Sequence, residues 1–267
     1  MKICNRIMLI GLIACGIKPS AIQANSSTGV LFDGTNGVIS VANSTGLNLS
    51  GAFTLEAWIY PHSLSGQKDL IYKWSAGGYV NQRSYFLQLY NDQLEFSVNA
   101  TGLSANNLAI GSNTRLQSNV WTHVAGVYDG TNLNLYINGS KDSAYISEVG
   151  GAFTGNAPVF IGGTGSFGYE RFDGGMDEVR ISDIVRYTSN FTPTSSEFVL
   201  DSHTVLLLHM NEGSGTNTTN FGLVGGNGYL NSGVFWNTGY VVPEPSTFIL
   251  VGLGLLPLLC LCRRTTG

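Results

Sequence analysis

The sequence predicts an all-β protein in which antiparallel sheets pack face to face as a sandwich. Short runs of strand-forming residues recur at regular spacing along the chain, with turn residues between them. Glycine is abundant at 35 residues, and charged residues make up only 11% of the chain. This composition fits strands and tight turns better than solvent-exposed helices.

Residues 121–139 are the clearest unit of this pattern. Two apolar-rich runs flank Asp129-Gly130, a dipeptide that favours the positive φ angles of a hairpin turn. In the second run, the apolar residues of 133–137 alternate with polar ones, which is typical of a strand with one buried face. Asn138-Gly139 supplies a second turn, so the unit is expected to form a meander.

The other strands are predicted from the same signals. Residues 53–60 alternate strongly, and Pro61 ends that strand. The further strands are expected at 29–32, 38–41, 70–74, 84–90, 93–99, 140–147, 158–161, 176–182, 205–210 and 229–236. Polar or glycine-rich loops are expected at 43–50, 75–83, 106–117, 162–168 and 212–228, and one helical turn at 182–187.

Charge and cysteine placement exclude several classes of protein. The net charge is −4, and no run of Lys or Arg is dense enough to follow a phosphate backbone, so we expect no nucleic-acid partner. All 4 cysteines lie in the two terminal apolar stretches. The middle of the chain therefore has no disulfide and no cysteine-bound metal.

Residues 1–24 are predicted to be a signal peptide. Lys2 and Arg6 precede a short apolar run at 7–13, and the small residue Ala24 ends a cleavage site. An alternative stays open, because residues 12–15 fit a lipoprotein processing box that would leave Cys15 as the lipidated first residue. Under cleavage after Ala24, the exported domain spans residues 25–240.

Residues 241–267 form a tail with three parts. Pro243, Glu244 and Pro245 come first, an apolar run follows at 247–261, and Arg263 and Arg264 come last. The run is at the short edge of the roughly 17–25 residues that span a bilayer. The trailing arginines favour a cytoplasmic end, which leaves the domain outside.

This tail resembles the PEP-CTERM sorting signal of Gram-negative bacteria that secrete exopolysaccharide. The resemblance implies an exosortase-type processing enzyme as partner, removal of the tail, and delivery to the envelope or matrix. A plain C-terminal transmembrane anchor is the alternative.

Six segments, in order, resemble a laminin G-like domain of the concanavalin A-like superfamily. They are LFDG at 31–34, FTLEAWI at 53–59, WTHVAGVY at 121–128, LYING at 135–139, IGG at 161–163 and DEVR at 177–180. The resemblance implies a jelly-roll β-sandwich of two antiparallel sheets. Residues 206–215 resemble a segment that opens such domains in many bacterial members. Here we expect it to add a strand to the same sandwich, and the alternative is the truncated start of a second domain.

The superfamily includes glycan hydrolases and lyases, so catalysis has to be judged from the residues themselves. A retaining glycosidase needs two carboxylates about 5–5.5 Å apart, and no predicted strand carries acidic residues alternating on one face. Glu56 stands alone, and the adjacent Asp177 and Glu178 would point to opposite faces of a strand. His123 lies among apolar residues and is expected to be structural. We therefore expect no catalytic residues and no enzyme activity.

Calcium is the candidate cofactor. The resemblance places such a site at Asp33 and Asp177, with Asn36 or a carbonyl near Gly174 completing the oxygen ligands. In the structural alternative, Asp33 caps its own turn and Asp177 pairs with an arginine.

Sugar binding would use aromatic rings beside amide and carboxylate groups. One such group lies on the polar face of the predicted strands and comprises Glu56, Trp58, Tyr60, Asn134 and Tyr136. The other is carried by loops, and it is the set predicted to bind ligand: Trp74, Tyr79, Asn81, Arg83 and Tyr169. Loop residues are preferred because loops carry function, whereas Glu56 and Trp58 belong to the family framework.

These features together predict an exported, non-catalytic protein of the envelope or exopolysaccharide matrix of a Gram-negative bacterium. Its partner would be a glycan or a matrix protein. Two alternatives are an exopolysaccharide-processing hydrolase or lyase and a purely structural matrix protein. The ligand, and whether the mature chain stays anchored or is released, are left open by the sequence.

Overall fold

A computed structural model describes residues 29–74, 78–106, 108–146, 150–164 and 170–237. The predicted signal peptide and sorting tail lie outside these ranges. Within them, no helix is long and apolar enough to cross a membrane. The described ranges include two short 3-10 turns, Thr45–Leu47 and Ser104–Asn106.

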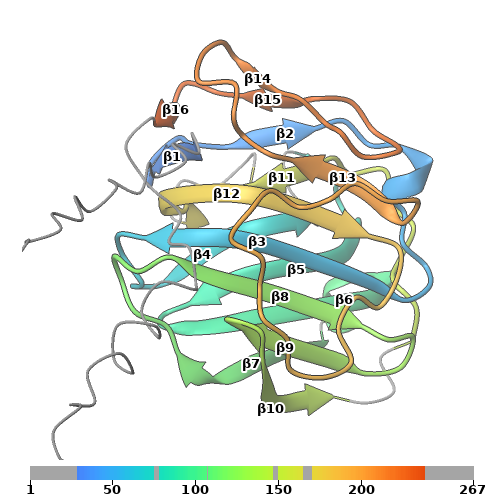
Figure 1. Ribbon diagram of the computed structural model, residues 1–267. Coiled ribbons are helices and arrows are strands. Elements are labelled where there is room, and N and C mark those ends of the chain that lie inside the picture. The colour runs from blue at the N-terminus through green and yellow to red at the C-terminus, as the bar shows by residue number, and fades with distance from the viewer. Residues whose placement is uncertain (1–28, 75–77, 107, 147–149, 165–169, 238–267) are drawn as a thin grey trace, which may run out of the picture.

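Two antiparallel sheets of eight strands each build the protein (Figure 1). Sheet A has the order β10 (Ser140–Ile146), β9 (Leu133–Ile137), β8 (Thr122–Tyr128), β3 (Phe53–Pro61), β12 (Asp173–Ser182), β1 (Gly29–Asp33) and β16 (Val234–Asn237), and β13 (Thr204–Leu208) also pairs with β12. Sheet B has the order β14 (Asn217–Thr218), β15 (Gly228–Leu230), β2 (Ile39–Val41), β11 (Val159–Ile161), β4 (Gln67–Lys73), β5 (Arg83–Tyr90), β6 (Gln93–Gly102) and β7 (Leu108–Arg115). The jelly-roll sandwich predicted from the sequence is confirmed.

The core lies between the inner faces of the two sheets. Phe53 of β3 is fully buried there, and its ring centroid is 5.3 Å from Tyr85 and 6.0 Å from Phe96 on sheet B. Tyr128 of the neighbouring strand β8 is 5.5 Å from the same ring. Alternation places such residues inward at every second position, so most strands of both sheets contribute to one continuous hydrophobic cluster.

The turns of the central meander form as their residues predict. The Asp129 carboxylate accepts hydrogen bonds from the backbone N–H groups of Thr131 and Asn132 at 2.9 and 2.7 Å. Asn138 and Gly139 have φ angles of 48° and 75°, the left-handed geometry of a tight hairpin. Gly139 also tolerates no side chain, because a Cβ atom there would lie 2.0 Å from the Phe191 carbonyl oxygen.

Three expectations about secondary structure are wrong. Residues 106–117 are not an irregular loop, because β7 lies within them and pairs with β6 along the edge of sheet B. The apolar pattern of β7 is weak, since Ile110 is the only buried apolar residue of that strand. Residues 182–187 form no helical turn. Thr54 replaces the helical hydrogen bonds there, since its hydroxyl donates to the Ile184 carbonyl and accepts from the Arg186 N–H.

The third concerns residues 229–236, which form two strands rather than one. Asn231 makes the break, because its side-chain oxygen accepts a hydrogen bond from the Val38 N–H at 2.9 Å. The chain turns at this point and passes from β15 in sheet B to β16 in sheet A. Residues 204–237 therefore supply strands to both sheets, as expected for one sandwich.

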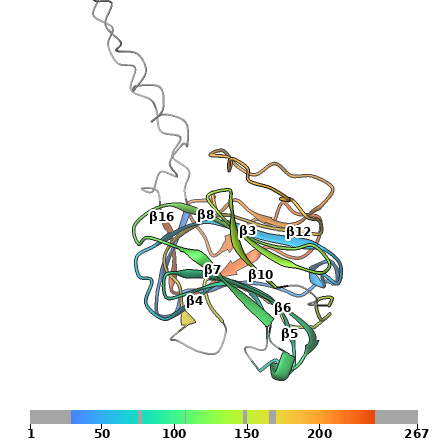
Figure 2. The same cartoon turned by 90° about the horizontal axis from the view of Figure 1, so that it is seen from below.

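The outer face of sheet A is covered by the segment between β12 and β13, residues 183–203. Figure 2 shows this orange segment looping above β3 and β12, on the side away from sheet B. Its apolar residues complete two small clusters on that face. One contains Trp58, Trp121, Phe198 and Leu207, and the other contains Ala125, Val127 and Tyr136 with Val185, Tyr187 and Phe191.

A substitution at Gly126 on β8 tests how closely the two sheets pack. A Cβ atom there would lie 2.6 Å from the Phe96 ring of sheet B, so Gly126→Ala should force the sheets apart locally. We expect a loss of about 1–3 kcal/mol in the free energy of unfolding, measured by denaturant titration. Gly51→Ala is the matched control because a Cβ atom there meets nothing within 4 Å. Equal stability of the two variants would contradict this account of the interface.

Candidate functional site

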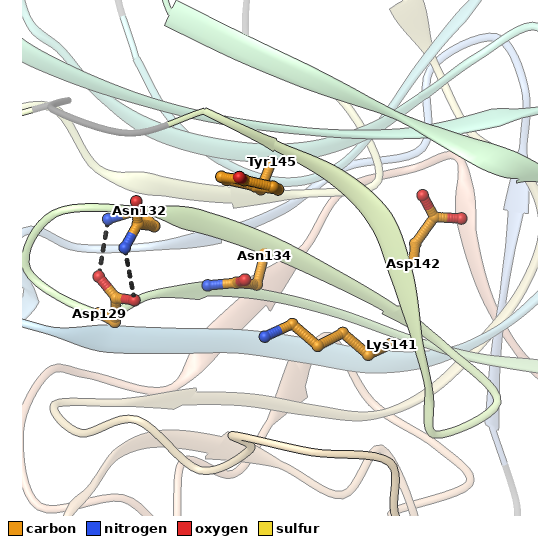
Figure 3. Close-up of a pocket in the computed structure, with 6 residues that line it drawn as sticks. All are labelled: Asp129, Asn132, Asn134, Lys141, Asp142 and Tyr145. Carbon is orange, nitrogen blue, oxygen red and sulfur yellow. Dashed lines mark hydrogen bonds between the residues drawn. The ribbon is translucent and has the colours of Figure 1, made fainter.

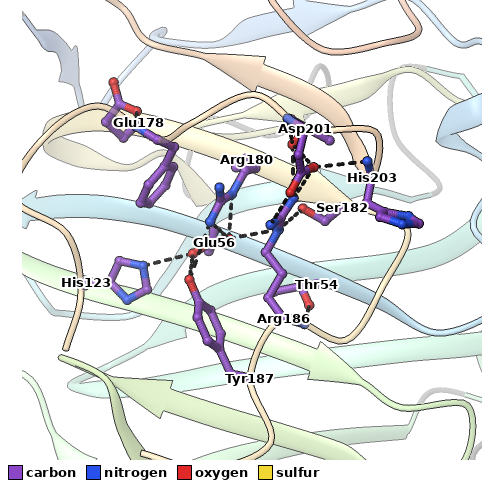
Figure 4. A network of polar contacts seen from close by, with 12 residues as sticks. Thr54, Glu56, His123, Glu178, Arg180, Ser182, Arg186, Tyr187, Asp201 and His203 are labelled. Carbon is purple, nitrogen blue, oxygen red and sulfur yellow. Dashed lines mark hydrogen bonds and ion pairs between the residues drawn. The ribbon is translucent and has the colours of Figure 1, made fainter. Parts of the chain in front are cut away.

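A buried polar network lies beneath the segment that covers sheet A (Figure 4). Glu56 of β3 is at its centre and is fully buried. Arg180 is its register partner on β12, and the Arg180 Nε donates to Glu56 Oε1 at 2.8 Å. The other oxygen, Oε2, accepts from the Tyr187 hydroxyl at 2.7 Å and lies 3.1 Å from His123 Nε2.

Aromatic side chains seal this network from solvent. The rings of Tyr187 and Phe191 stack at 3.6 Å, and the Arg180 guanidinium lies 4.2 Å from the Phe198 ring. His123 is also fully buried, with its ring edge-on to Phe191. A substrate has no route to Glu56 through these contacts.

The electrostatics of Glu56 are those of a structural ion. Burial by itself would raise the pKa of Glu56, but the hydrogen bond from His123 and the charge of Arg180 more than offset this, and the pKa is lowered. A general acid requires a raised pKa. Glu56 therefore stays ionised and neutralises the buried Arg180.

The predicted loop set is only partly brought together. Trp74 is buried, and the Arg83 guanidinium lies 6.0 Å from the centre of its ring. Tyr79 and Asn81 are exposed, and Asn81 lies in a turn with a φ angle of 55°. Tyr169 lies outside the described residues.

Trp74 is buried because aromatic residues from two other strands meet it on the outer face of sheet B. Its ring is 5.0 Å from Phe86 of β5, and Tyr72 of β4 stacks on Phe86 at 5.8 Å. Phe160 of β11 belongs to the same cluster. All four rings are at most 8% exposed, so they pack on one another and present no open stacking face.

The two predicted calcium residues lie far apart. Asp33 pairs in register with Asp173 at the end of β1, and Asp177 is four residues further along β12, about 13 Å away. Asp33 Oδ1 already accepts from the N–H groups of Thr35, Asn36 and Gly37. Asp177 is buried. The two carboxylates do not fit one ion together, and among the described residues no group of three or more His, Cys, Asp or Glu could hold a metal.

An open hollow of about 490 Å³ lies where β9 and β10 end the outer face of sheet A (Figure 3). Tyr145 of β10 faces Asn134 of β9 in register, and Lys141 faces Tyr136, so these side chains share one face. Tyr145 is 66% exposed, and Asn134 is half-buried beside it. The lining residues are Asp129, Asn132, Asn134, Lys141, Asp142 and Tyr145.

Turns and backbone hydrogen bonds hold the polar groups of this hollow in place. Asn132 Nδ2 donates to Asp129 Oδ2 at 3.2 Å, in addition to the two backbone N–H groups bound by Asp129. Asp142 lies on the other side of β10 from Asn134 in Figure 3. Its oxygens accept from the backbone N–H groups of Asn113 and Thr114 on β7 at 2.9 and 3.0 Å.

Both carboxyl groups of the hollow are stabilised as anions. Partial burial would raise the pKa of Asp129, but hydrogen bonds from Asn132 and Thr131 and the nearby Lys141 charge lower it overall. The pKa of Asp142 is likewise lowered, because three backbone N–H groups outweigh its burial. Neither group is suited to donate a proton near neutral pH, whereas both can accept hydrogen bonds in a fixed direction.

The sequence identified Asn134 and missed the rest of the hollow. A polar and aromatic alternation around a hairpin was visible in residues 129–145, and this signal was interpreted as framework. The β-bulge between Lys141 and Tyr145 was not predictable, and it decides which side chains of β10 stand opposite β9.

A family model described as the concanavalin A-like lectin/glucanase superfamily matches residues 33–190, which is more than half of the chain. The chain belongs to this superfamily. A second model, the PEP-CTERM protein-sorting motif, matches residues 241–264. Both resemblances seen in the sequence are thereby confirmed, and the sorting motif implies export to the envelope or extracellular space and processing by exosortase-type machinery.

Solved structures of the superfamily share the fold at low identity. A proposed carbohydrate-binding protein from Bacteroides ovatus is 22% identical, with a TM-score of 0.57 over 79% of this chain and 59% of its own. This chain thus spans well under two thirds of that protein. The carbohydrate-binding module of a Ruminococcus gnavus sialidase, bound to sialyllactose, is 16% identical, with a TM-score of 0.48 over 61% of this chain and 94% of its own.

Domains LG4–5 of the mouse laminin α1 chain are 15% identical, with a TM-score of 0.45 over 62% of this chain and 47% of their own. No curated protein matches the chain.

Glu56→Gln tests whether the network supports the superfamily fold. The change leaves Arg180 and His123 buried beside a neutral amide, so we expect a loss of about 3–5 kcal/mol in the free energy of unfolding. Asp92→Asn is the control, because it breaks an exposed ion pair with Arg115 that should contribute no more than about 1 kcal/mol. Urea titration of both variants measures the difference. A Glu56→Gln variant as stable as the control would contradict the structural role of Glu56.

Proposed function

We propose that the exported domain binds glycan through the hollow formed by β9 and β10. The observation that supports this most directly is the exposed ring of Tyr145 beside oriented polar groups. A sugar ring has an apolar face that covers an aromatic ring and hydroxyls that need donors and acceptors. Here Lys141 donates, Asn134 does both, and the Asp129 carboxylate accepts.

The charge of the hollow favours a neutral sugar. Its side chains carry two carboxylates and one ammonium group, so their sum is negative. A uronic acid or sulfated sugar would be repelled by Asp129 and Asp142, whereas neutral hydroxyls can replace the water that these oxygens bind. The proposed ligand is therefore a neutral polysaccharide, such as one component of a secreted matrix.

Binding is favoured over catalysis by the state of the carboxylates. A glycoside hydrolase needs one carboxyl group with a raised pKa beside an ionised partner. The Asp129 and Asp142 carboxylates both have lowered pKa values, and Glu56 is sealed in the interior. The proposed activity is therefore recognition without bond cleavage. A structural matrix protein without a glycan ligand is the competing function.

Tyr145→Ala tests this proposal against the structural alternative. Loss of the ring should weaken binding to neutral polysaccharide about tenfold, which corresponds to ~1.4 kcal/mol. Tyr229→Ala is the matched control, since Tyr229 is 56% exposed but lies on β15 of sheet B. Affinity electrophoresis against neutral and uronic-acid polymers measures both variants. If the wild-type chain binds none of these polymers, or binds the acidic ones better, the proposal fails.

We propose a calcium site only at the end of β1. Asp33 and its register partner Asp173 are neighbours there, and backbone carbonyls of the adjoining turn could complete an oxygen shell. Addition of calcium after chelator treatment should raise the Tm, because an ion that binds only the folded chain stabilises it. Asp173→Asn should remove this shift, and Asp177→Asn should leave it intact. An unchanged Tm in the wild-type chain would exclude the site.

A further inference from the structure

The chain ends of the described domain meet at one edge of sheet A. Gly29 at the start of β1 pairs with Asn237 at the end of β16. The sorting motif begins at residue 241, only four residues beyond Asn237. The apolar run of the tail begins at residue 247, ten residues beyond Asn237, and ten residues span at most about 35 Å, so an attachment made through the sorting segment leaves the domain at this edge.

The hollow lies at the opposite edge of the same sheet, and the strand register measures the separation. Trp236 of β16 pairs with Val30, Val30 with Met176, and Met176 with Ile59 of β3. From the other side, Asn134 of β9 pairs with Val127, and Val127 with Thr54 of β3.

The series of register partners that starts at Trp236 reaches β3 at Ile59, and the series that starts at Asn134 reaches it at Thr54, five residues away. The hollow is therefore displaced from the chain ends by about 17 Å along the strands. Five strand-to-strand steps separate β16 from β9, which adds about 24 Å across the sheet. The resulting distance is about 29 Å, close to the full width of the sheet. Figure 1 shows the same arrangement, with β1 and β16 at the upper left and β9 and β10 at the bottom.

We infer that attachment through the sorting segment holds the domain by its β1–β16 edge and directs the hollow away from the attachment surface. The ligand of the hollow is then a polysaccharide chain that is free of that surface, rather than a glycolipid within it. A glycolipid headgroup would have to reach across the width of the sheet, whereas a matrix polysaccharide meets the hollow first. The choice of ligand rests on the proposed glycan binding, while the orientation does not.

Energy transfer to a membrane tests the orientation directly. The full chain, with its native cysteines replaced by serine, would carry one donor dye at Tyr145→Cys or at Phe235→Cys. Phe235 is 53% exposed on β16, so both positions accept a dye. Each chain is inserted through its sorting segment into phosphatidylcholine vesicles that contain an acceptor-labelled lipid. We expect clearly stronger transfer from position 235 than from position 145.

Equal transfer, stronger transfer from position 145, or failure of the chain to associate with the vesicles would overturn the inference. In a second arm, the vesicle-held wild-type chain should bind neutral polysaccharide as tightly as the free chain does. Binding lost on attachment, or preferential capture of vesicles containing a neutral glycolipid that Tyr145→Ala removes, would also overturn it. If the free chain binds no polysaccharide, the proposed function fails, and the transfer measurement still decides the orientation.

Discussion

The buried carboxylate of Glu56 sets a constraint that much of sheet A has to meet. A carboxylate removed from water is costly unless donors surround it, and here they come from three different parts of the chain. Arg180 reaches it from β12, His123 from β8, and Tyr187 from the covering segment. The register of three strands and the path of residues 183–203 are thus tied to one side chain.

The covering segment in turn decides where the protein can meet a ligand. Tyr187, Phe191 and Phe198 occupy the middle of the outer face of sheet A. The aromatic cluster around Trp74 fills part of the outer face of sheet B in a similar way. On sheet A, the edge at β9 and β10, beyond Tyr136, is left uncovered by this segment, and the hollow lies there. Lys141 and the bulge of β10 also protect this edge from pairing with another strand.

The superfamily explains the framework and leaves the ligand to be argued from the site. A sandwich of this kind hosts both binding proteins and enzymes, so the fold alone does not separate them. For the hollow, the proposed distinction between binding and catalysis rests on the protonation of its two carboxyl groups. Asp129 and Asp142 hold their charge because backbone N–H groups surround them, which suits hydrogen bonding to hydroxyls and not proton transfer. Because the sorting motif follows β16 closely, we infer that the hollow faces away from the surface to which the domain is attached.

The sequence by itself determined the sandwich and the central meander, because these depend on alternation and on residues within a few positions of one another. It also predicted the sorting tail, whose parts are contiguous. Strand β7 was missed because its pairing with β6, and not its own apolar content, makes it a strand.

Only the tertiary structure decided which aromatic residues are free to bind. Trp74 was predicted as a ligand residue, but Phe86 and Phe160 arrive from other strands and bury it. Tyr145 lay in a strand that was predicted, yet its position opposite Asn134 depends on a bulge that no local signal announces. Exposure and register are properties of the assembled sheets, and they place the candidate site at the edge rather than in the loops.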